Sequence, residues 1–136
     1  MVVTVTQASA RVPVTVLHIK GDVDGASYEE LIDKARELTQ SGPLNIVLDF
    51  GGVPFLSSAG LMALYSIAQM ARGLPQPGPD DGWENFRSVA REGGSDKQQH
   101  LKLLNVSAKV NKVLVMTGFD RFFEFYTDQQ AAVASF

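Results

Sequence analysis

Two adjacent serines, Ser57 and Ser58, have the clearest capacity for chemistry in this 136-residue chain. They follow the apolar run "NIVLDF" and directly precede "AGLMAL", which reads as the start of a helix. One serine is enough to cap a helix, because its hydroxyl accepts one of the unpaired backbone N–H groups of the first turn. The second hydroxyl is then free for another purpose, such as carrying a phosphate at the positive end of the helix dipole.

A hydrolase would need a base beside Ser58, and the chain has two histidines, His18 and His100. His18 lies inside a strand pattern and His100 opens another strand, so a structural or solvent-facing role is favoured for both. The stretch around Ser58 also lacks the Gly-x-Ser-x-Gly turn of many serine hydrolases. We therefore expect a protein that is not an enzyme.

Nucleotide and metal sites find little support in the sequence. The run "GGVPFLSSAG" lacks the Gly-Lys-Ser/Thr ending of a phosphate-binding loop. There is no cysteine, and the histidines are far apart in the sequence. Asp22 and Asp24 could hold a cation, but a solvated turn explains them more simply. We expect no bound metal and no cofactor.

The composition is that of a single globular domain, with 45% hydrophobic and 20% charged residues. The formal net charge of −3 argues against direct nucleic-acid binding, which usually needs a basic face. No apolar run approaches the roughly 20 residues of a transmembrane segment, and the N-terminus has no secretory pattern. The default expectation is a cytoplasmic location.

Periodicity predicts alternating strands and helices along most of the chain. The alternation of residues 13–20 predicts a strand, with 2–6 as its hairpin partner and "QASARV" as the turn. Ser27 and Glu30 form a capping-box pattern for the first helix, with Asp24 as a competing cap and Gly42 as its stop. Further elements are predicted as strands at 44–50 and 100–106, helices at 58–72 and after Ser107 up to Gly118, an extended 121–128 and a final short helix.

Residues 73–99 differ from the rest, because proline, glycine and charged residues dominate them. A loop of this length is unusual in a compact domain, so we interpret it as an insertion before the late strand. A surface excursion is the favoured reading. The alternative is a partner contact through Trp83 and Phe86, on a short helix inside the insertion. The whole order predicts an α/β fold, with helices covering a mixed or parallel sheet.

Three stretches together resemble the STAS domain of bacterial anti-sigma factor antagonists: "IKGDVDGASYEEL", "NIVLDFGGVPFLSSAGLMAL" and "LKLLNVSAKVNKVLVMTGFDRFFEFY". The resemblance covers nearly all of the chain outside the insertion. It implies one STAS-like domain over 1–136, with a mixed central sheet of about four or five strands and about four helices. The family motif reads aromatic, apolar, Asp, Ser, Ser or Thr, Gly, Leu; Ser57 here replaces the usual Asp.

The resemblance also implies a mechanism, called partner switching. The unphosphorylated domain binds an anti-sigma factor that is a serine kinase, which frees the sigma factor for transcription. The kinase, with its own ATP and Mg²⁺, phosphorylates the serine that aligns with Ser58, the complex separates, and a serine phosphatase resets the cycle. The residues implied in partner binding lie around that serine: Asp22, Asp24, Ser57, Ala59, Gly60 and Leu61.

Two further expectations stay open at the level of sequence. The alternative function is that of a STAS scaffold without phosphorylation, or of a ligand-sensing subunit of a signalling or membrane-transport assembly. This alternative stays open because Ser57 stands where the family motif usually has Asp. A homodimer is also possible through an aromatic cluster near the C-terminus, although burial in the core is favoured for it. The cluster consists of Phe119, Phe122, Phe123, Phe125 and Tyr126.

Overall fold

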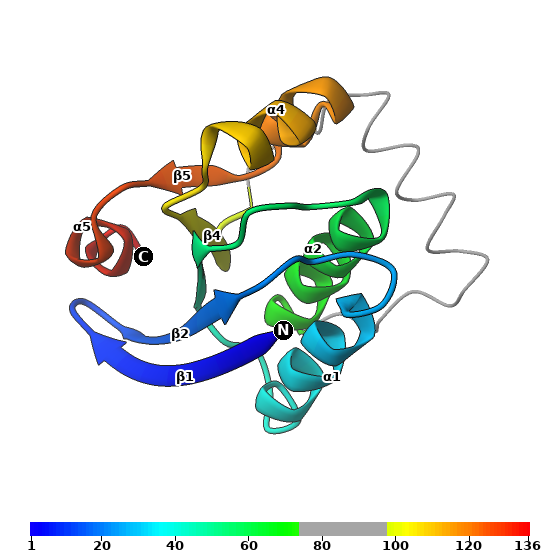
Figure 1. Cartoon of the computed structure of the whole chain (residues 1–136). Coiled ribbons are helices and arrows are strands. Elements are labelled where there is room, and N and C mark those ends of the chain that lie inside the picture. The colour runs from blue at the N-terminus through cyan, green and yellow to red at the C-terminus, as the bar shows by residue number, and fades with distance from the viewer. Residues whose placement is uncertain (74–97) are drawn as a thin grey trace.

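A computed structural model describes residues 1–73 and 98–136 of the chain. The proposed helix of the insertion, with Trp83 and Phe86, lies outside the described residues, as does most of the 73–99 insertion. The rest forms an α/β fold built on a mixed five-stranded sheet with four helices, as the sequence predicts (Figure 1).

The sheet has its strands in sequence order, β1-β2-β3-β4-β5. β1 pairs with β2 as an antiparallel hairpin, and the remaining neighbours pair in parallel. All four parallel strands therefore end at one edge of the sheet, which we call the carboxyl edge. The strands are β1 (Val2–Ser9), β2 (Pro13–Lys20), β3 (Ile46–Gly52), β4 (Leu101–Leu104) and β5 (Glu124–Tyr126).

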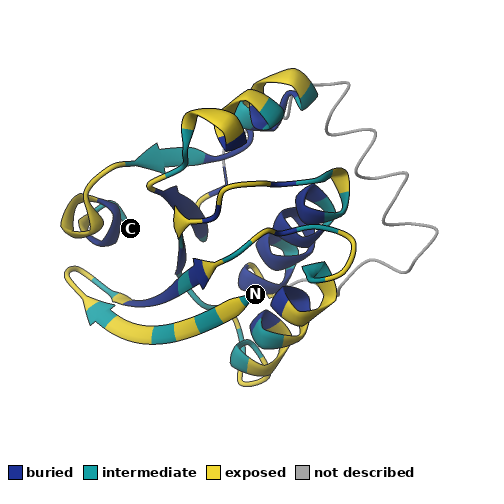
Figure 2. Ribbon diagram, in the orientation of Figure 1, coloured by how far each residue is buried: buried dark blue, intermediate teal, exposed yellow. Residues whose placement is uncertain are grey.

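Helices cover both faces of the sheet, but unequally (Figures 1 and 2). The main core lies on the face covered by α1, α2 and α4, and a smaller cluster lies on the other face under α5. A short 3-10 helix, η1 (Phe119–Arg121), precedes β5. The helices are α1 (Tyr28–Leu38), α2 (Ser58–Ala71), α4 (Ala108–Thr117) and α5 (Gln129–Ala134).

The alternation of β2 explains how one strand serves both cores. Leu17 and Ile19 point into the main core, whereas Val14 and Val16 contact the cluster under α5. Successive side chains of a strand point to opposite faces, so the sequence pattern correctly predicts this division. Each fully buried aliphatic side chain contributes about 1.5–3 kcal/mol relative to exposure, so these positions largely fix the register of the strand.

Some local predictions are confirmed and others are wrong. Ser107 caps α4 by accepting the Val110 N–H at 3.2 Å, and Gly118 ends that helix in the left-handed conformation, as predicted. The capping box of Ser27 does not form, because its hydroxyl turns back toward the preceding turn. Gly42 does not stop α1, which ends at Leu38. β1 continues through Ser9, three residues beyond its predicted end.

The aromatic cluster near the C-terminus belongs largely to the core. Phe119, Phe122 and Phe123 are buried, and the Phe122 ring lies edge-on to the other two at centroid distances of 5.8 and 4.9 Å. Edge-to-face packing of this kind adds to the stabilisation by burial. The favoured reading of these three residues as core is therefore confirmed, and they offer no surface for a homodimer.

Candidate functional site

The carboxyl edge of the sheet brings together two segments that are far apart in the sequence. The turn after β2 and the segment between β3 and α2 form an isolated parallel bridge between Val23 and Leu56. The Val23 N–H donates to the Phe55 carbonyl at 3.0 Å, and the Ser57 N–H donates to the Val23 carbonyl at 2.9 Å. The acidic turn is thereby held against the start of α2, in the region where open α/β sheets place their binding sites.

Ser57 has a structural role. It is the N-cap of α2, and its hydroxyl accepts the Gly60 N–H at 3.3 Å. Its extended backbone, with φ −93° and ψ 177°, is the conformation usual for an N-cap residue. The first of the two serines is therefore occupied by helix capping.

Ser58 is the first residue of α2, and it is exposed. Its hydroxyl makes no hydrogen bond with any residue that the structure describes. It stands where the unpaired N–H groups of the first turn and the positive end of the dipole favour an added anion. The pair of serines is thus divided into one capping hydroxyl and one free hydroxyl.

Gly60 and Leu61, the next two positions implied in partner binding, are buried in this structure. Leu61 is fully buried, and Gly60 is packed so closely that a Cβ there would lie 2.7 Å from the Val23 carbonyl oxygen and collide with the Leu56 side chain. Gly60, which the resemblance implies in partner binding, is thus in close contact with the protein's own Val23 turn. Ala59 is half-buried between these inward positions and the exposed Ser58.

The two aspartates of the turn have different surroundings. Asp24 is half-buried, and one of its carboxylate oxygens accepts the Ala26 N–H at 3.0 Å, which stabilises the turn. Asp22 is exposed, and its carboxylate has no partner among the described residues. Asp22 therefore leaves a full negative charge on the surface beside the helix start. Nearby, the charge of Glu29 raises the pKa of the Tyr28 phenol, which stays neutral at pH 7.

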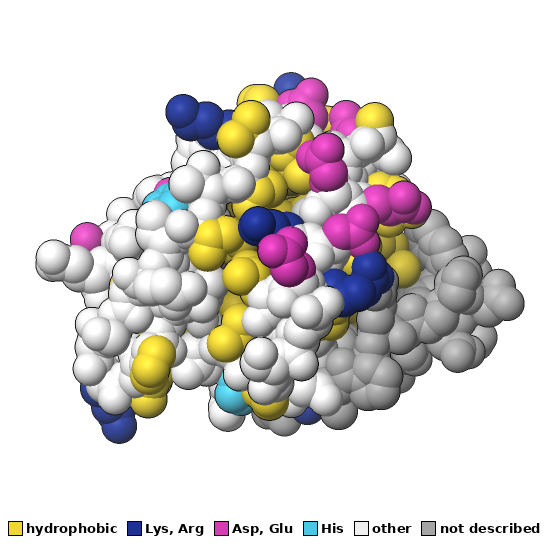
Figure 3. Space-filling model, turned by 90° about the horizontal axis from the view of Figure 1, so that it is seen from below, with side chains coloured by type: hydrophobic (Ala, Val, Ile, Leu, Met, Phe, Trp, Pro, Cys, Tyr) yellow, Lys and Arg dark blue, Asp and Glu magenta, His cyan; other side chains and the backbone are white. Residues whose placement is uncertain are grey.

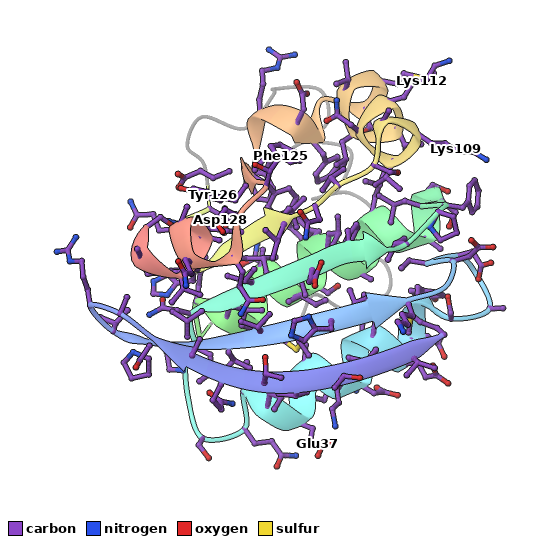
Figure 4. The ribbon with its side chains drawn as sticks, turned by 60° about the vertical axis from the view of Figure 1, so that its left-hand side comes forward. Glu37, Lys109, Lys112, Phe125, Tyr126 and Asp128 are labelled. Carbon is purple, nitrogen blue, oxygen red and sulfur yellow. The ribbon has the colours of Figure 1, made fainter. Side chains whose placement is uncertain are left out.

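Sequence reasoning missed two neighbours of the site, Phe55 and Lys109. Phe55 is exposed, with 39% of its surface accessible. The Lys109 ammonium group, from the first turn of α4, lies 6.0 Å from the centre of its ring. Lys109 extends from α4 into solvent (Figure 4). The aromatic position of the motif could have indicated Phe55; Lys109 had no comparable signal.

The sequence of the chain matches a family model described as "STAS domain" over residues 5–74, which is just over half of its length. The chain therefore belongs to the STAS domain family. The search of curated proteins found no relative.

Solved structures share the fold of this STAS domain at low sequence identity. An anti-sigma factor antagonist from Mycobacterium paratuberculosis is 18% identical, with 98% of this chain and 93% of that chain aligned at a TM-score of 0.66. The unphosphorylated form of the anti-sigma factor antagonist SpoIIAA is also 18% identical, with 94% of this chain and 92% of that chain aligned at a TM-score of 0.60. The phosphorylated form of Bacillus SpoIIAA is 17% identical, with 94% of this chain and 96% of that chain aligned at a TM-score of 0.54.

The histidines of this STAS domain offer no base to Ser58. Both ring nitrogens of His18 are engaged, with Thr6 Oγ1 at 3.0 Å and Asp49 Oδ2 at 2.7 Å. His100 precedes β4 and so lies at the opposite edge of the parallel sheet from Ser58. A serine hydrolase needs its base within hydrogen-bond reach of the nucleophile, and the described residues do not provide one.

The described residues contain neither a metal-ligating cluster nor a membrane-spanning helix. No three His, Cys, Asp or Glu side chains of residues 1–73 and 98–136 are grouped in a way that could hold a metal ion. Within the same ranges, no helix is both long enough and apolar enough to cross a membrane.

Proposed function

We propose that this STAS domain is an anti-sigma factor antagonist that acts by partner switching. In its unphosphorylated state it binds an anti-sigma factor serine kinase through the exposed surface around Ser58, which frees a sigma factor. The kinase phosphorylates Ser58, and a serine phosphatase later removes the phosphate. The observation that carries the proposal is the free, exposed hydroxyl of Ser58 at the first turn of α2, beside the hydroxyl of Ser57 that is already used as a cap.

The charges at the site support a switch in binding. A phosphate on Ser58 adds about −1.5 to −2 charges at pH 7, close to the turn that carries the unpaired carboxylate of Asp22. In a close interface these charges would repel each other and would lose their water. A loss of about 3 kcal/mol weakens binding more than a hundredfold.

The fold itself has no reason to open on phosphorylation. The phosphate would stand at the N-terminus of a 14-residue helix, where backbone N–H groups and the dipole stabilise negative charge. The cap of α2 comes from Ser57, so modification of Ser58 leaves the cap in place. Modification can therefore change the partner without changing the structure of the domain.

Phosphopeptide mapping tests the assignment. The purified domain is incubated with Mg-ATP and each candidate anti-sigma factor serine kinase of the same genome. We expect one phosphate on the wild type and none on Ser58→Ala. The matched control is Ser57→Ala, which should still be phosphorylated because it removes the neighbouring hydroxyl only. Phosphate on another residue, or on the Ser58→Ala variant, would contradict the proposal.

A second candidate is a STAS scaffold that binds partners without being phosphorylated. Ser57 stands at the usual Asp position of the family motif, and in the structure its side chain is a neutral helix cap. A kinase that recognises an acidic group next to its target serine would not find one there. Stable binding of the kinase with no gain in mass after incubation with Mg-ATP would favour the scaffold.

A further inference from the structure

β1 is the outermost strand of the sheet, and none of the described residues pairs with its outer edge (Figures 1 and 4). The strand has eight residues, "VVTVTQAS", with no charge and no proline. Its pairing with β2 runs from Val2 opposite Lys20 to Ser9 opposite Pro13 without a bulge. Natural edge strands are usually protected by charges, prolines, bulges or short length, because an unprotected edge can pair with another strand.

The other edge of the sheet has such protection. β5 has only three residues, and it begins with Glu124. A strand of three residues offers few backbone groups to another strand, and short length is one way in which natural proteins protect an edge. The two edges of one sheet therefore differ, and β1 is the edge able to accept a further strand.

The register of the hairpin identifies the backbone groups that face outward. The Thr15 N–H donates to Asn45 on the β3 side at 2.8 Å, so it is not available to Gln7, its opposite residue in β1. Residues of an antiparallel pair alternate between bonding across the pair and facing away from it. Gln7, and with it Val5 and Val3, therefore directs its N–H and C=O groups to the free edge.

We propose that β1 pairs with β1 of a second copy of this chain, antiparallel and about a two-fold axis at Val5. Identical strands that pair in this way form a self-complementary interface of the kind found in two-fold dimers. Val5 then lies opposite Val5 of the second copy, and Val3 lies opposite Gln7. On the other face Thr4 lies opposite Thr6, and cross-strand threonine pairs are favourable. No charged side chain of β1 is buried by this pairing.

The charges on the surface beside the edge are partly paired. α1 lies next to β1 and carries charges of both signs, which gather over this helix (Figure 3). Two of its ion pairs form within the helix, between Arg36 and Asp33 and between Lys34 and Glu37. α1 has four acidic and two basic side chains, so a net charge of −2 remains on the helix beside the uncharged edge. At physiological ionic strength, salt screens the repulsion that this charge causes between two copies.

Light scattering coupled to size exclusion tests the dimer over roughly 5 to 500 μM protein, a range that brackets a micromolar association. We expect the mass to rise with concentration toward twice the 14.7 kDa of one chain. Gln7→Pro removes an outward backbone N–H but no backbone hydrogen bond to β2, and should weaken self-association about tenfold. Gln7→Ala is the matched control. Both variants lose the bond between the Gln7 side chain and Thr15, but only the alanine keeps the backbone N–H.

Amide hydrogen exchange provides a readout that does not depend on the variants folding well. In a β1 pair, the amides of Val3, Val5 and Gln7 become protected as the protein concentration rises, while those of Thr4 and Thr6 are protected at all concentrations. A protein that stays at 14.7 kDa over the whole range overturns the proposal. So does a dimer in which the three odd-numbered amides exchange freely. This inference is independent of the proposed function, since β1 carries none of the residues around Ser58.

Discussion

Two groups of residues lie at the carboxyl edge of the sheet, and members of both groups follow one another closely between Phe55 and Leu61. The first, which we call the joint, consists of Val23, Leu56, Gly60 and Leu61, all buried. The second, which we call the rim, consists of Asp22, Phe55, Ser58 and Lys109, all exposed. Residues one or two positions apart therefore have opposite tasks: the joint holds the turn against the helix, and the rim is what another molecule can reach.

The comparison separates changes that affect folding from changes that affect binding. A substitution in the joint alters packing between two chain segments and should be seen in the free energy of unfolding. A substitution in the rim alters little inside the protein and should be seen in partner affinity. A joint variant that changes only partner affinity, or a rim variant that changes only the free energy of unfolding, would contradict this separation.

The largest effect is expected for Gly60→Val in the joint. The side chain would collide with Leu56 and with the Val23 carbonyl, so the helix must move away from the turn. We expect a loss of about 3 kcal/mol or more in the free energy of unfolding, measured by urea denaturation. Ala59→Val places the same side chain at the half-buried neighbour and should cost less than about 1 kcal/mol. Equal stability of Gly60→Val and the wild type would show that the joint is not tightly packed.

Ser58→Asp should have the next largest effect, and it should be on binding. A carboxylate at position 58 adds negative charge to the rim, close to the acidic turn. This charge weakens binding to a partner whose surface is complementary to the neutral serine. We expect affinity for the anti-sigma factor kinase to fall on the order of a hundredfold, measured by isothermal titration calorimetry. The free energy of unfolding should be unchanged or slightly higher, because negative charge is favourable in the first turn.

The matched control for that variant is Ser58→Asn, which has the same size and no charge. It should bind within a few-fold of the wild type. If the asparagine variant binds as poorly as the aspartate variant, then shape rather than charge controls the interface. The electrostatic account of the switch would then be wrong.

The sequence predicted the architecture better than it predicted the division between joint and rim. Strand alternation, the Ser107 cap and the Gly118 stop are local signals, and they were correct. The close packing of Gly60 has no local signal in the sequence, because it depends on a bridge between Val23 and Leu56, 33 positions apart. The same is true of Ser27, whose hydroxyl bonds to the Asp22 carbonyl at 2.7 Å instead of to its own helix.

Phe55 provides a smaller test of the rim. An exposed aromatic side chain next to a candidate phosphorylation site is the type of residue that contributes strongly to interfaces. We expect Phe55→Ala to lower affinity for the kinase about ten- to thirtyfold, measured by the same calorimetric titration, with little change in the urea midpoint.

Met116→Ala serves as the control for Phe55. Met116 is 77% exposed, and it lies about two helical turns along α4 from Lys109, the contact of Phe55. Its removal should change affinity less than twofold. A greater loss at Met116 than at Phe55 would place the docking surface along α4 rather than at the rim.

The smallest effect is expected for Ser57→Ala, which tests the boundary between the two regions. Ser57 is half-buried, and its hydroxyl accepts one N–H of the first turn of α2. Loss of an N-cap hydroxyl costs about 1 kcal/mol of stability, and Ser57→Asp should restore it because aspartate caps helices as well as serine does. Urea denaturation of the three proteins measures this. If stability is lost in Ser57→Ala and recovered in Ser57→Asp, Ser57 belongs with the joint. If Ser57→Ala changes affinity for the kinase but not the free energy of unfolding, the Ser57 hydroxyl belongs to the rim. The assignment of Ser57 to helix capping would then be wrong.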